Sequence, residues 1–285
     1  MATVLCVGLT TVDVVQQVTD FPAPGEKVQS LAVHMTPGGP AANAATAIAA
    51  LGHRAVLLTA LGSDAFAELA RSRLTARRVD VHDFAADVPV GPALSMVAVR
   101  ARDGERTVVS RNAQDIELRT TVDEMRRLVG ESDVLLLDGH LPPLALAAAR
   151  EAKAAGLPVV LDAGSWKPVL DDLLPFVDVA ACSSAFELSE RDLHDRGVPL
   201  VIRTNGAAPV TWSLDGATHE QPVGVVEVRD TNGAGDVWHG ALAVAVARRD
   251  AVPEAIGWAN AVAAVRVRNT AEEWFEELAR WLDSR

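Results

Sequence analysis

The feature that most restricts the fold of this chain is a series of short, almost wholly apolar segments that alternate with alanine-rich stretches of helical pattern. Clear examples of the apolar segments are Val134–Leu137, Val159–Leu161 and Val198–Ile202. Strands without a polar face are typical of parallel strands that helices cover on both sides. The alternation therefore predicts an α/β fold with a doubly wound sheet.

The same pattern predicts the positions of the individual elements. Strands are expected at residues 3–8, 55–61, 133–138, 158–162, 178–182, 199–203 and 209–214. Helices are expected at residues 41–51, 64–78, 122–129, 143–155, 184–193, 236–248, 254–267 and 271–282. Residues 12–36 and 86–110 instead alternate apolar with polar side chains, which is typical of antiparallel strands with one solvated face. We expect these two insertions to form a small β-sheet lid, with extra edge strands on the main sheet as the alternative.

Composition excludes several classes of partner. The chain has 38 acidic and 26 basic side chains, a formal net charge of −12, so nucleic acid is not an expected partner. The sequence has no uncharged apolar run of about 18 residues and begins as a strand rather than a signal peptide, so we expect no membrane span. Cys6 and Cys182 lie far apart in apolar runs and are predicted to be buried thiols, which fits a cytoplasmic location.

The most informative segment is Asp230-Thr-Asn-Gly-Ala-Gly-Asp236, which runs into a long apolar helical stretch. Gly233 and Gly235 let backbone N–H groups converge, and a helix start adds unsatisfied N–H groups and a positive dipole end. Together these favour an anion site that can stabilise charge on a transferring phosphoryl group. Asp236 is either a helix N-cap or a general base, and the spacing alone leaves both open. The chain lacks a lysine after a glycine-rich loop, so it has no Walker A motif.

A second glycine-rich turn, Pro37-Gly38-Gly39-Pro40, opens the helix expected at 41–51 and places Asn43 one turn in. It is either a ligand-binding turn or a purely structural strand-to-helix turn. His140 and Asp162 each follow an apolar strand, at the sheet edge where open α/β folds bind ligands. His140 is a candidate substrate contact or a loop cap.

These segments resemble the ribokinase (phosphofructokinase-B) family of sugar kinases. Gly38–Gly52 looks like the first family signature and Asp230–Asp236 like the second, and Val7–Asp13, Leu61–Phe66 and Thr204–Gly206 match connecting features in order. The resemblance implies one ribokinase-like kinase domain over residues 1–285, a three-layer αβα sandwich with a small β-sheet lid. It also implies ATP-dependent phosphorylation of a hydroxyl of a small carbohydrate, Mg²⁺, and a homodimer that pairs through the lids.

The resemblance also assigns residues. Asp236 corresponds to the base that takes the hydroxyl proton, and Gly233, Ala234 and Gly235 supply the anion-site amides. The candidate sugar contacts are Asp13, Gly38, Gly39, Asn43, Arg111 and His140. The candidate nucleotide contacts are Thr204, Gly206, Thr231 and Asn260, and the candidate Mg²⁺ residues are Glu187 and Asp162, of which Asp162 can equally belong to a polar network.

Two departures from the family pattern bear on the nucleotide. The family's metal-associated Asn-x-x-Glu is Ser184-Ala-Phe-Glu187 here, so a carboxylate is kept and an amide is lost. After residues 262–268 the chain goes straight to Asn269, where relatives carry a Gly/Pro-bearing loop that helps to wall the adenine and a monovalent-cation site. Potassium activation and nucleotide preference therefore stay open.

Within the family, residues 230–247 and 104–109 most resemble ketohexokinase-like and sulfofructose-kinase-like members. Sulfosugar enzymes tend to carry arginine at the position of His140, which disfavours a sulfonate substrate. The sequence predicts a kinase for a primary hydroxyl of a ketose or pentose, ketohexokinase- or ribokinase-like. A nucleoside kinase and a non-catalytic sugar- or nucleotide-binding homologue are the alternatives.

Overall fold

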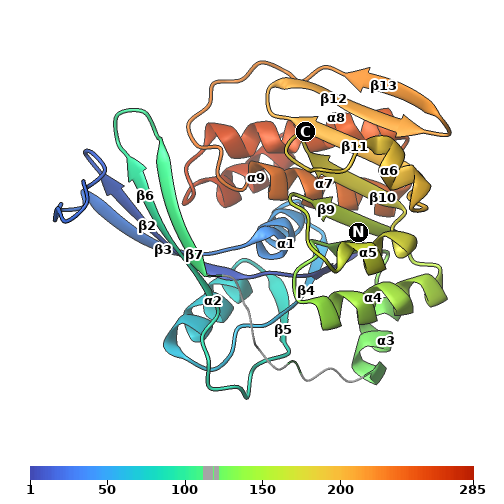
Figure 1. The fold of residues 1–285 in the computed structure, drawn as a ribbon, viewed down its shortest axis with the longest axis horizontal. Helices are drawn as coiled ribbons and strands as arrows, with labels where there is room; N and C mark the ends of the chain where they lie inside the picture. The colour runs from blue at the N-terminus through green and yellow to red at the C-terminus, as the bar shows by residue number, and fades with distance from the viewer. Residues whose placement is uncertain (112–117, 119–121) are drawn as a thin grey trace.

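A nine-stranded sheet forms the centre of the molecule. The computed structural model describes residues 1–111, 118 and 122–285 (Figure 1). The strand order is β13-β12-β11-β10-β9-β8-β1-β4-β5. The strands are β1 Thr3–Val7, β4 Arg54–Thr59, β5 Val79–Asp83, β8 Val134–Leu137, β9 Val159–Ala163, β10 Val179–Ser183, β11 Leu200–Asn205, β12 Ala208–Leu214 and β13 Ala217–Gln221. All pairs from β5 to β11 are parallel, and β12 and β13 extend the sheet antiparallel.

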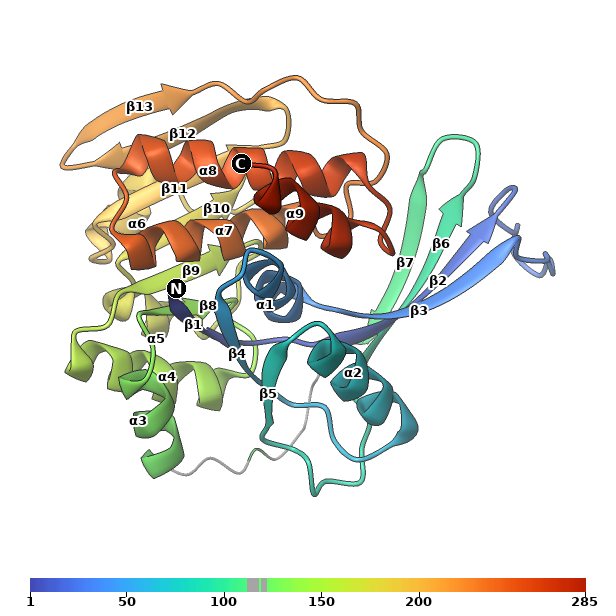
Figure 2. The same cartoon turned by 180° about the vertical axis from the view of Figure 1, so that it is seen from behind.

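Helices cover both faces of this sheet (Figures 1 and 2). One face packs against α1 Pro40–Ala50, α7 Ala234–Arg248, α8 Val252–Arg268 and α9 Trp274–Asp283. The other packs against α3 Val122–Gly130, α4 Pro142–Ala155, α5 Leu170–Leu173 and α6 Glu190–Asp195, with the short 3₁₀ turn Leu174–Phe176. On β1, Val4 and Cys6 face the first layer while Leu5 and Val7 face the second, which is why residues 4–7 include no charged or hydroxyl side chain. The predicted three-layer αβα sandwich is confirmed.

A second sheet of four strands projects from the side of the sandwich (Figure 2). Its order is β3-β2-β6-β7, with β2 Thr11–Val18, β3 Ala32–Gly38, β6 Ala93–Arg100 and β7 Arg106–Arg111. The pairs β2–β3 and β6–β7 are antiparallel hairpins, but β2 and β6 pair in parallel. The base of this sheet packs through Val12 on Ala67 and Ala70 of α2, Ala65–Ala76.

Some expected elements differ in the structure. The helix expected at 184–193 is wrong, since α6 begins only at Glu190. Ser189 caps that helix by accepting a hydrogen bond from the backbone N–H of Asp192. Arg203 holds the preceding loop open by donating to the carbonyls of Phe186 and Leu188. Strands β5 and β13 were not predicted, because their mixed polar composition carries no apolar run.

In the part of the chain that the structure describes, no helix has both the length and the apolar character needed to cross a bilayer.

Candidate functional site

The candidate site is built around the start of α7, where α7 packs closely on α1. A Cβ at Gly240 would lie only 2.6 Å from the carbonyl oxygen of Ala44, so the two helices touch backbone to backbone. This approach brings the first turns of both helices together. There the Nδ2 group of Asn43 donates a hydrogen bond of 2.7 Å to Oδ2 of Asp236. Two residues 193 positions apart thus meet at one helix start.

The two glycines of the turn before α7, Gly233 and Gly235, have different surroundings. Gly233 is the N-cap residue with a φ of 69°, and a Cβ there would lie 3.1 Å from Nδ2 of Asn43. At Gly235 a Cβ would meet nothing within 4 Å, so the space in front of this residue is open. The N–H of Ala234 donates to the carbonyl of Thr231 within the turn. A helix N-terminus that faces open space can accept an anion.

Asp236 is the third residue of α7 and is half-buried. Its carboxylate bonds to Asn43 and does not cap the helix, because Gly233 is the N-cap and no side-chain cap bond is present. Burial raises the pKa of Asp236 to about 6, and the charge of Asp162 adds to the effect, while the Asn43 amide and His239 oppose it. A carboxylate with this pKa is mostly ionised at neutral pH and is basic enough to take a proton from a hydroxyl in a transition state.

One turn further along α7, His239 and Asp162 form a buried pair behind Asp236. His239 Nδ1 lies 3.2 Å from Oδ2 of Asp162, and its Nε2 lies 3.1 Å from the carbonyl oxygen of Ala181. Burial lowers the pKa of His239, but the charges of Asp162 and Asp236 outweigh it and raise the pKa above the ordinary value. The sequence analysis missed His239. The signal that could have found it is its position three residues after Asp236, on the same face of the helix.

Asp138, at the end of β8, was also missed by the sequence analysis. Its buried carboxylate accepts hydrogen bonds from the backbone N–H groups of Leu9 (2.8 Å), Ala41 (3.2 Å) and His140 (2.8 Å). His140 Nδ1 lies 3.2 Å from the same carboxylate. Burial raises the pKa of Asp138, but His140 and the donated N–H groups outweigh it and hold the pKa below its ordinary value. Asp138 thus ties together the end of β1, the start of α1 and the loop that carries His140.

Asp13 lies on β2 with its carboxylate against the first glycine-rich turn. The hydroxyl of Thr11 donates to it at 2.7 Å, and burial raises its pKa. A Cβ at Gly38 would lie 2.2 Å from Oδ2 of Asp13. Gly39 has a φ of 93°, and a Cβ there would lie 2.4 Å from the carbonyl oxygen of Leu9. Both glycines are therefore required for the turn to approach β1 and β2.

Asp13, Asn43 and Gly233 line one narrow cavity of about 20 Å³, together with Asn232 and Arg266. Two contacts bridge the four-stranded sheet to the sandwich beside it. Arg106 Nη1 donates to Oδ1 of Asn232 at 2.9 Å, and His34 pairs with Glu272 at 2.7 Å. The cavity thus lies between the four-stranded sheet, which supplies Asp13, and the starts of α1 and α7, which supply Asn43 and Gly233.

The candidate nucleotide residues lie on different elements and are more open. The hydroxyl of Thr204 donates a hydrogen bond of 3.4 Å to the carbonyl oxygen of Cys182. Gly206 is exposed and has a φ of 56°. Oδ1 of Asn260 accepts a hydrogen bond of 2.8 Å from the indole N–H of Trp238, while its buried Nδ2 finds no partner among the described residues.

Three further candidates are exposed: Thr231, Glu187 and Arg111. Within residues 1–111, 118 and 122–285, no group of three or more His, Cys, Asp or Glu side chains lies close enough together to hold a metal ion by protein ligands alone.

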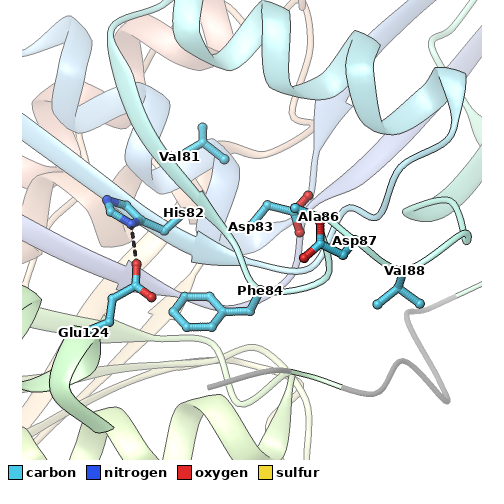
Figure 3. Close-up of a pocket in the computed structure, with 8 residues that line it drawn as sticks. All are labelled: Val81, His82, Asp83, Phe84, Ala86, Asp87, Val88 and Glu124. Carbon is cyan, nitrogen blue, oxygen red and sulfur yellow. Dashed lines mark hydrogen bonds and ion pairs between the residues drawn. The ribbon is translucent and has the colours of Figure 1, made fainter. Parts of the chain in front are cut away.

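A larger cavity of about 350 Å³ lies elsewhere, at the end of the edge strand β5 (Figure 3). His82 and Glu124 face each other across it at 3.2 Å, and Asp83, Phe84 and Asp87 complete much of its wall. None of the candidate residues from the sequence lines this cavity. The residues that the sequence singles out therefore lie outside this larger cavity, although it has titratable side chains of its own.

Comparison with known proteins agrees with this geometry. The model of the pfkB family carbohydrate kinases matches residues 1–272. This chain belongs to that family.

Related proteins include the ribokinase of Haemophilus influenzae, 26% identical over 93% of this chain and 92% of the relative. The bifunctional protein HldE of Pectobacterium atrosepticum is 31% identical over 87% of this chain, which spans 55% of that relative. A solved structure, described as a putative ribokinase from Agrobacterium tumefaciens, has a TM-score of 0.82 at 28% identity and covers 99% of both chains.

The family membership confirms the resemblance seen in the sequence and shows the class of activity. The chain is a carbohydrate kinase, a phosphotransferase that acts on a hydroxyl group.

Proposed function

We propose that this pfkB-family kinase transfers the γ-phosphoryl group of ATP to a hydroxyl of a ketose or pentose, with Asp236 as the general base. The observation that carries the proposal is the Asn43–Asp236 hydrogen bond at the start of α7. The amide holds Oδ2, and Oδ1 accepts no hydrogen bond from any described residue, so Oδ1 is the atom that takes the hydroxyl proton. Proton removal by a placed base typically contributes about 10²–10⁴-fold to such a step.

The transferring phosphoryl group is stabilised by the start of α7. In the turn of Gly233, Ala234 and Gly235, the N–H of Ala234 already donates to the carbonyl of Thr231, so the donors offered to the phosphoryl group include the N–H of Gly235, beside open space, and the positive end of the helix dipole. Such donors act where charge develops and do not reorganise during the reaction. This arrangement replaces the lysine that a Walker A loop would supply.

The sugar binds between the two glycine-rich turns. Asp13 and Asn43 offer acceptors and a donor to its hydroxyl groups beside Gly38 and Gly39, and a site of this kind rejects analogues that lack those hydroxyls. His140, fixed by Asp138, approaches from the β8 loop.

We propose that the four-stranded sheet is a lid that covers the sugar, with Arg111 at the end of β7 as a further contact. The lid would be formed by roughly residues 12–36 and 86–110, as a part of one kinase domain that covers residues 1–285. One face carries the exposed apolar side chains of Val33, Met35, Met96 and Val109, which the strand register places together. An exposed apolar sheet face is a surface that proteins usually cover, and a second copy of the lid in a C₂ homodimer would cover it.

The nucleotide lies along Thr204, Gly206, Thr231 and Asn260, and Mg²⁺ accompanies its phosphates. Mg²⁺ keeps several of its waters and needs only one or two protein carboxylates, which fits a site where Glu187 offers one exposed carboxylate. When bound, the ion would neutralise charge on the phosphates. Asp162 is left out of this metal set, because its carboxylate faces His239.

A coupled assay of ADP release over a panel of ketoses, pentoses and nucleosides tests the proposal. We expect turnover with a ketose or pentose, and a kcat about 10²–10⁴-fold lower for Asp236→Asn on the same sugar. Turnover confined to nucleosides would instead identify a nucleoside kinase. A melting-temperature increase with a sugar, without ADP release on any member of the panel, would identify a binding protein that lacks catalysis.

A further inference from the structure

Arg266, in the last turn of α8, is a buried cation held by three oxygen contacts. Its side chain is 3% exposed. Nη2 donates to Oδ2 of Asp230 at 2.8 Å, and Nη1 donates to the carbonyl oxygens of Asn269 at 2.9 Å and of Asp230 at 3.3 Å. The guanidinium carbon also lies 5.9 Å from the ring centroid of Trp274. Arginine is rarely buried to this degree unless it is paired, so these contacts form a built environment for the charge.

The oxygens that Arg266 binds belong to the segment directly before the anion site. Oδ1 of Asp230 accepts a hydrogen bond of 2.8 Å from the backbone N–H of Asn232, the residue before Gly233. The backbone N–H of Asp230 donates to the carbonyl of Val267, next to Arg266. The guanidinium therefore fixes the path of residues 230–232 and, through them, the start of α7 that carries Asp236.

A carboxylate oxygen and two backbone carbonyls are the kind of ligands that bind a monovalent cation. The family resemblance puts a monovalent-cation site against the loop that follows this helix, and in this chain Asn269 stands in place of that loop. Its carbonyl and both groups of Asp230 already accept from Arg266. A potassium ion does not fit here, because these ligands are taken and a second positive charge beside a buried guanidinium is repelled.

We propose that Arg266 is a built-in cation that positions the loop before the anion site, so that this kinase needs no monovalent cation. The role in turnover rests on the proposed function. The expectation that nucleotide affinity and melting temperature are independent of K⁺ does not rest on the proposed function. It can be tested even if no sugar is turned over.

The first test uses the wild-type protein in matched solutions of KCl, NaCl and tetramethylammonium chloride. Three quantities are measured in each salt: the melting temperature, the affinity for a non-hydrolysable ATP analogue with Mg²⁺, and kcat on the active sugar. We expect the analogue affinity and kcat each to agree within about twofold across the three salts. The reason is that the guanidinium of Arg266, a part of the chain itself, already supplies the positive charge. A several-fold gain in affinity or kcat, or a higher melting temperature, that is specific to K⁺ would overturn the proposal.

The second test removes the charge. In Arg266→Gln we expect analogue affinity and kcat to fall by about tenfold or more, because charge-assisted hydrogen bonds are lost. Added guanidinium or K⁺ should restore part of the loss, and tetramethylammonium should not. Arg268→Gln, an equal charge change at an exposed position of the same helix, should behave as wild type. Wild-type affinity and kcat in Arg266→Gln would contradict a positioning role. Should Arg266→Gln fail to fold, Arg266→Lys and the wild-type salt series decide the question.

Discussion

The two halves of the proposed site are built differently. On the sugar side, the carboxylates of Asp13, Asp138 and Asp236 each receive hydrogen bonds from neighbouring groups and have shifted pKa values. On the nucleotide side, Glu187 and Gly206 are exposed on loops. The sugar half is therefore organised before any ligand binds, whereas the nucleotide half offers an open surface. Substitutions in the first half should have large effects and substitutions in the second half small ones.

The largest effect is expected at Asp236. Asp236→Asn keeps the shape of the side chain but cannot take the hydroxyl proton, so kcat should fall by about 10²–10⁴-fold. Steady-state kinetics on the active sugar measure this, and a melting curve verifies that the variant is folded. Asp283→Asn, the same change at an exposed position in α9, is the control and should leave kcat unchanged. A kcat for Asp236→Asn within a few-fold of wild type would place the base elsewhere.

The next effect is on sugar affinity. Asp13→Asn removes the negative charge that we propose binds sugar hydroxyls, and charge-assisted hydrogen bonds are worth about 1.5–3 kcal/mol each. We expect the KM for sugar to rise by about 10- to 100-fold while the KM for ATP stays nearly constant. If the two KM values rose together, Asp13 would be shaping the whole site and the contrast between its halves would disappear.

Asp138 should matter for stability. Asp138→Asn replaces an acceptor that receives three backbone N–H groups, two of them buried, so we expect the free energy of unfolding to fall by about 1.5–3 kcal/mol. Denaturant unfolding gives this value. Asp133→Asn is a matched control at the other end of β8, since exposed Asp133 accepts one backbone hydrogen bond, from Thr3. Equal losses in the two variants would mean that Asp138 is no more than an ordinary acceptor.

The smallest effect is expected on the nucleotide side. Glu187 is exposed, and solvent-exposed charge interactions contribute only about 0.2–1 kcal/mol. Glu187→Gln should therefore lower kcat at saturating Mg²⁺ by about fivefold or less and leave the melting curve unchanged. A loss comparable to that of Asp236→Asn would show that the nucleotide half is as tightly organised as the sugar half.

Local sequence signals predicted the parts of this structure that depend on neighbours in the chain. The apolar runs of the central strands identified the sandwich, because a strand buried on both faces has no polar position. The turn before Asp236 and the turn before Asn43 each showed a helix start with glycines. That the two residues bond to each other could not be predicted, since the contact depends on how α1 packs on α7.

The parts that were missed depend on long-range pairing. The partnership of His239 with Asp162, and the contacts of Asp138 with Leu9 and Ala41, join segments that nothing in their own sequence relates. The parallel pairing of β2 with β6 likewise joins two separate insertions, whose alternating pattern is equally compatible with antiparallel strands. The error at residues 184–193 has a similar origin, because Arg203 on another strand binds the carbonyls of that loop.

The central claim is that Asp236 acts as a base whose pKa is set by burial and by Asn43. The most direct measurement is the pH dependence of kcat/KM for sugar in wild type and in Asn43→Ala. Since the base must be ionised, activity should be full above about pH 7 and fall at lower pH, with a midpoint near the raised pKa of about 6. The Asn43 hydrogen bond lowers the pKa of Asp236, so the midpoint should move to higher pH in Asn43→Ala. A midpoint that came from ionisation of ATP would be the same in both proteins. An acid limb with the same midpoint in both proteins, or no limb at all, would contradict the account.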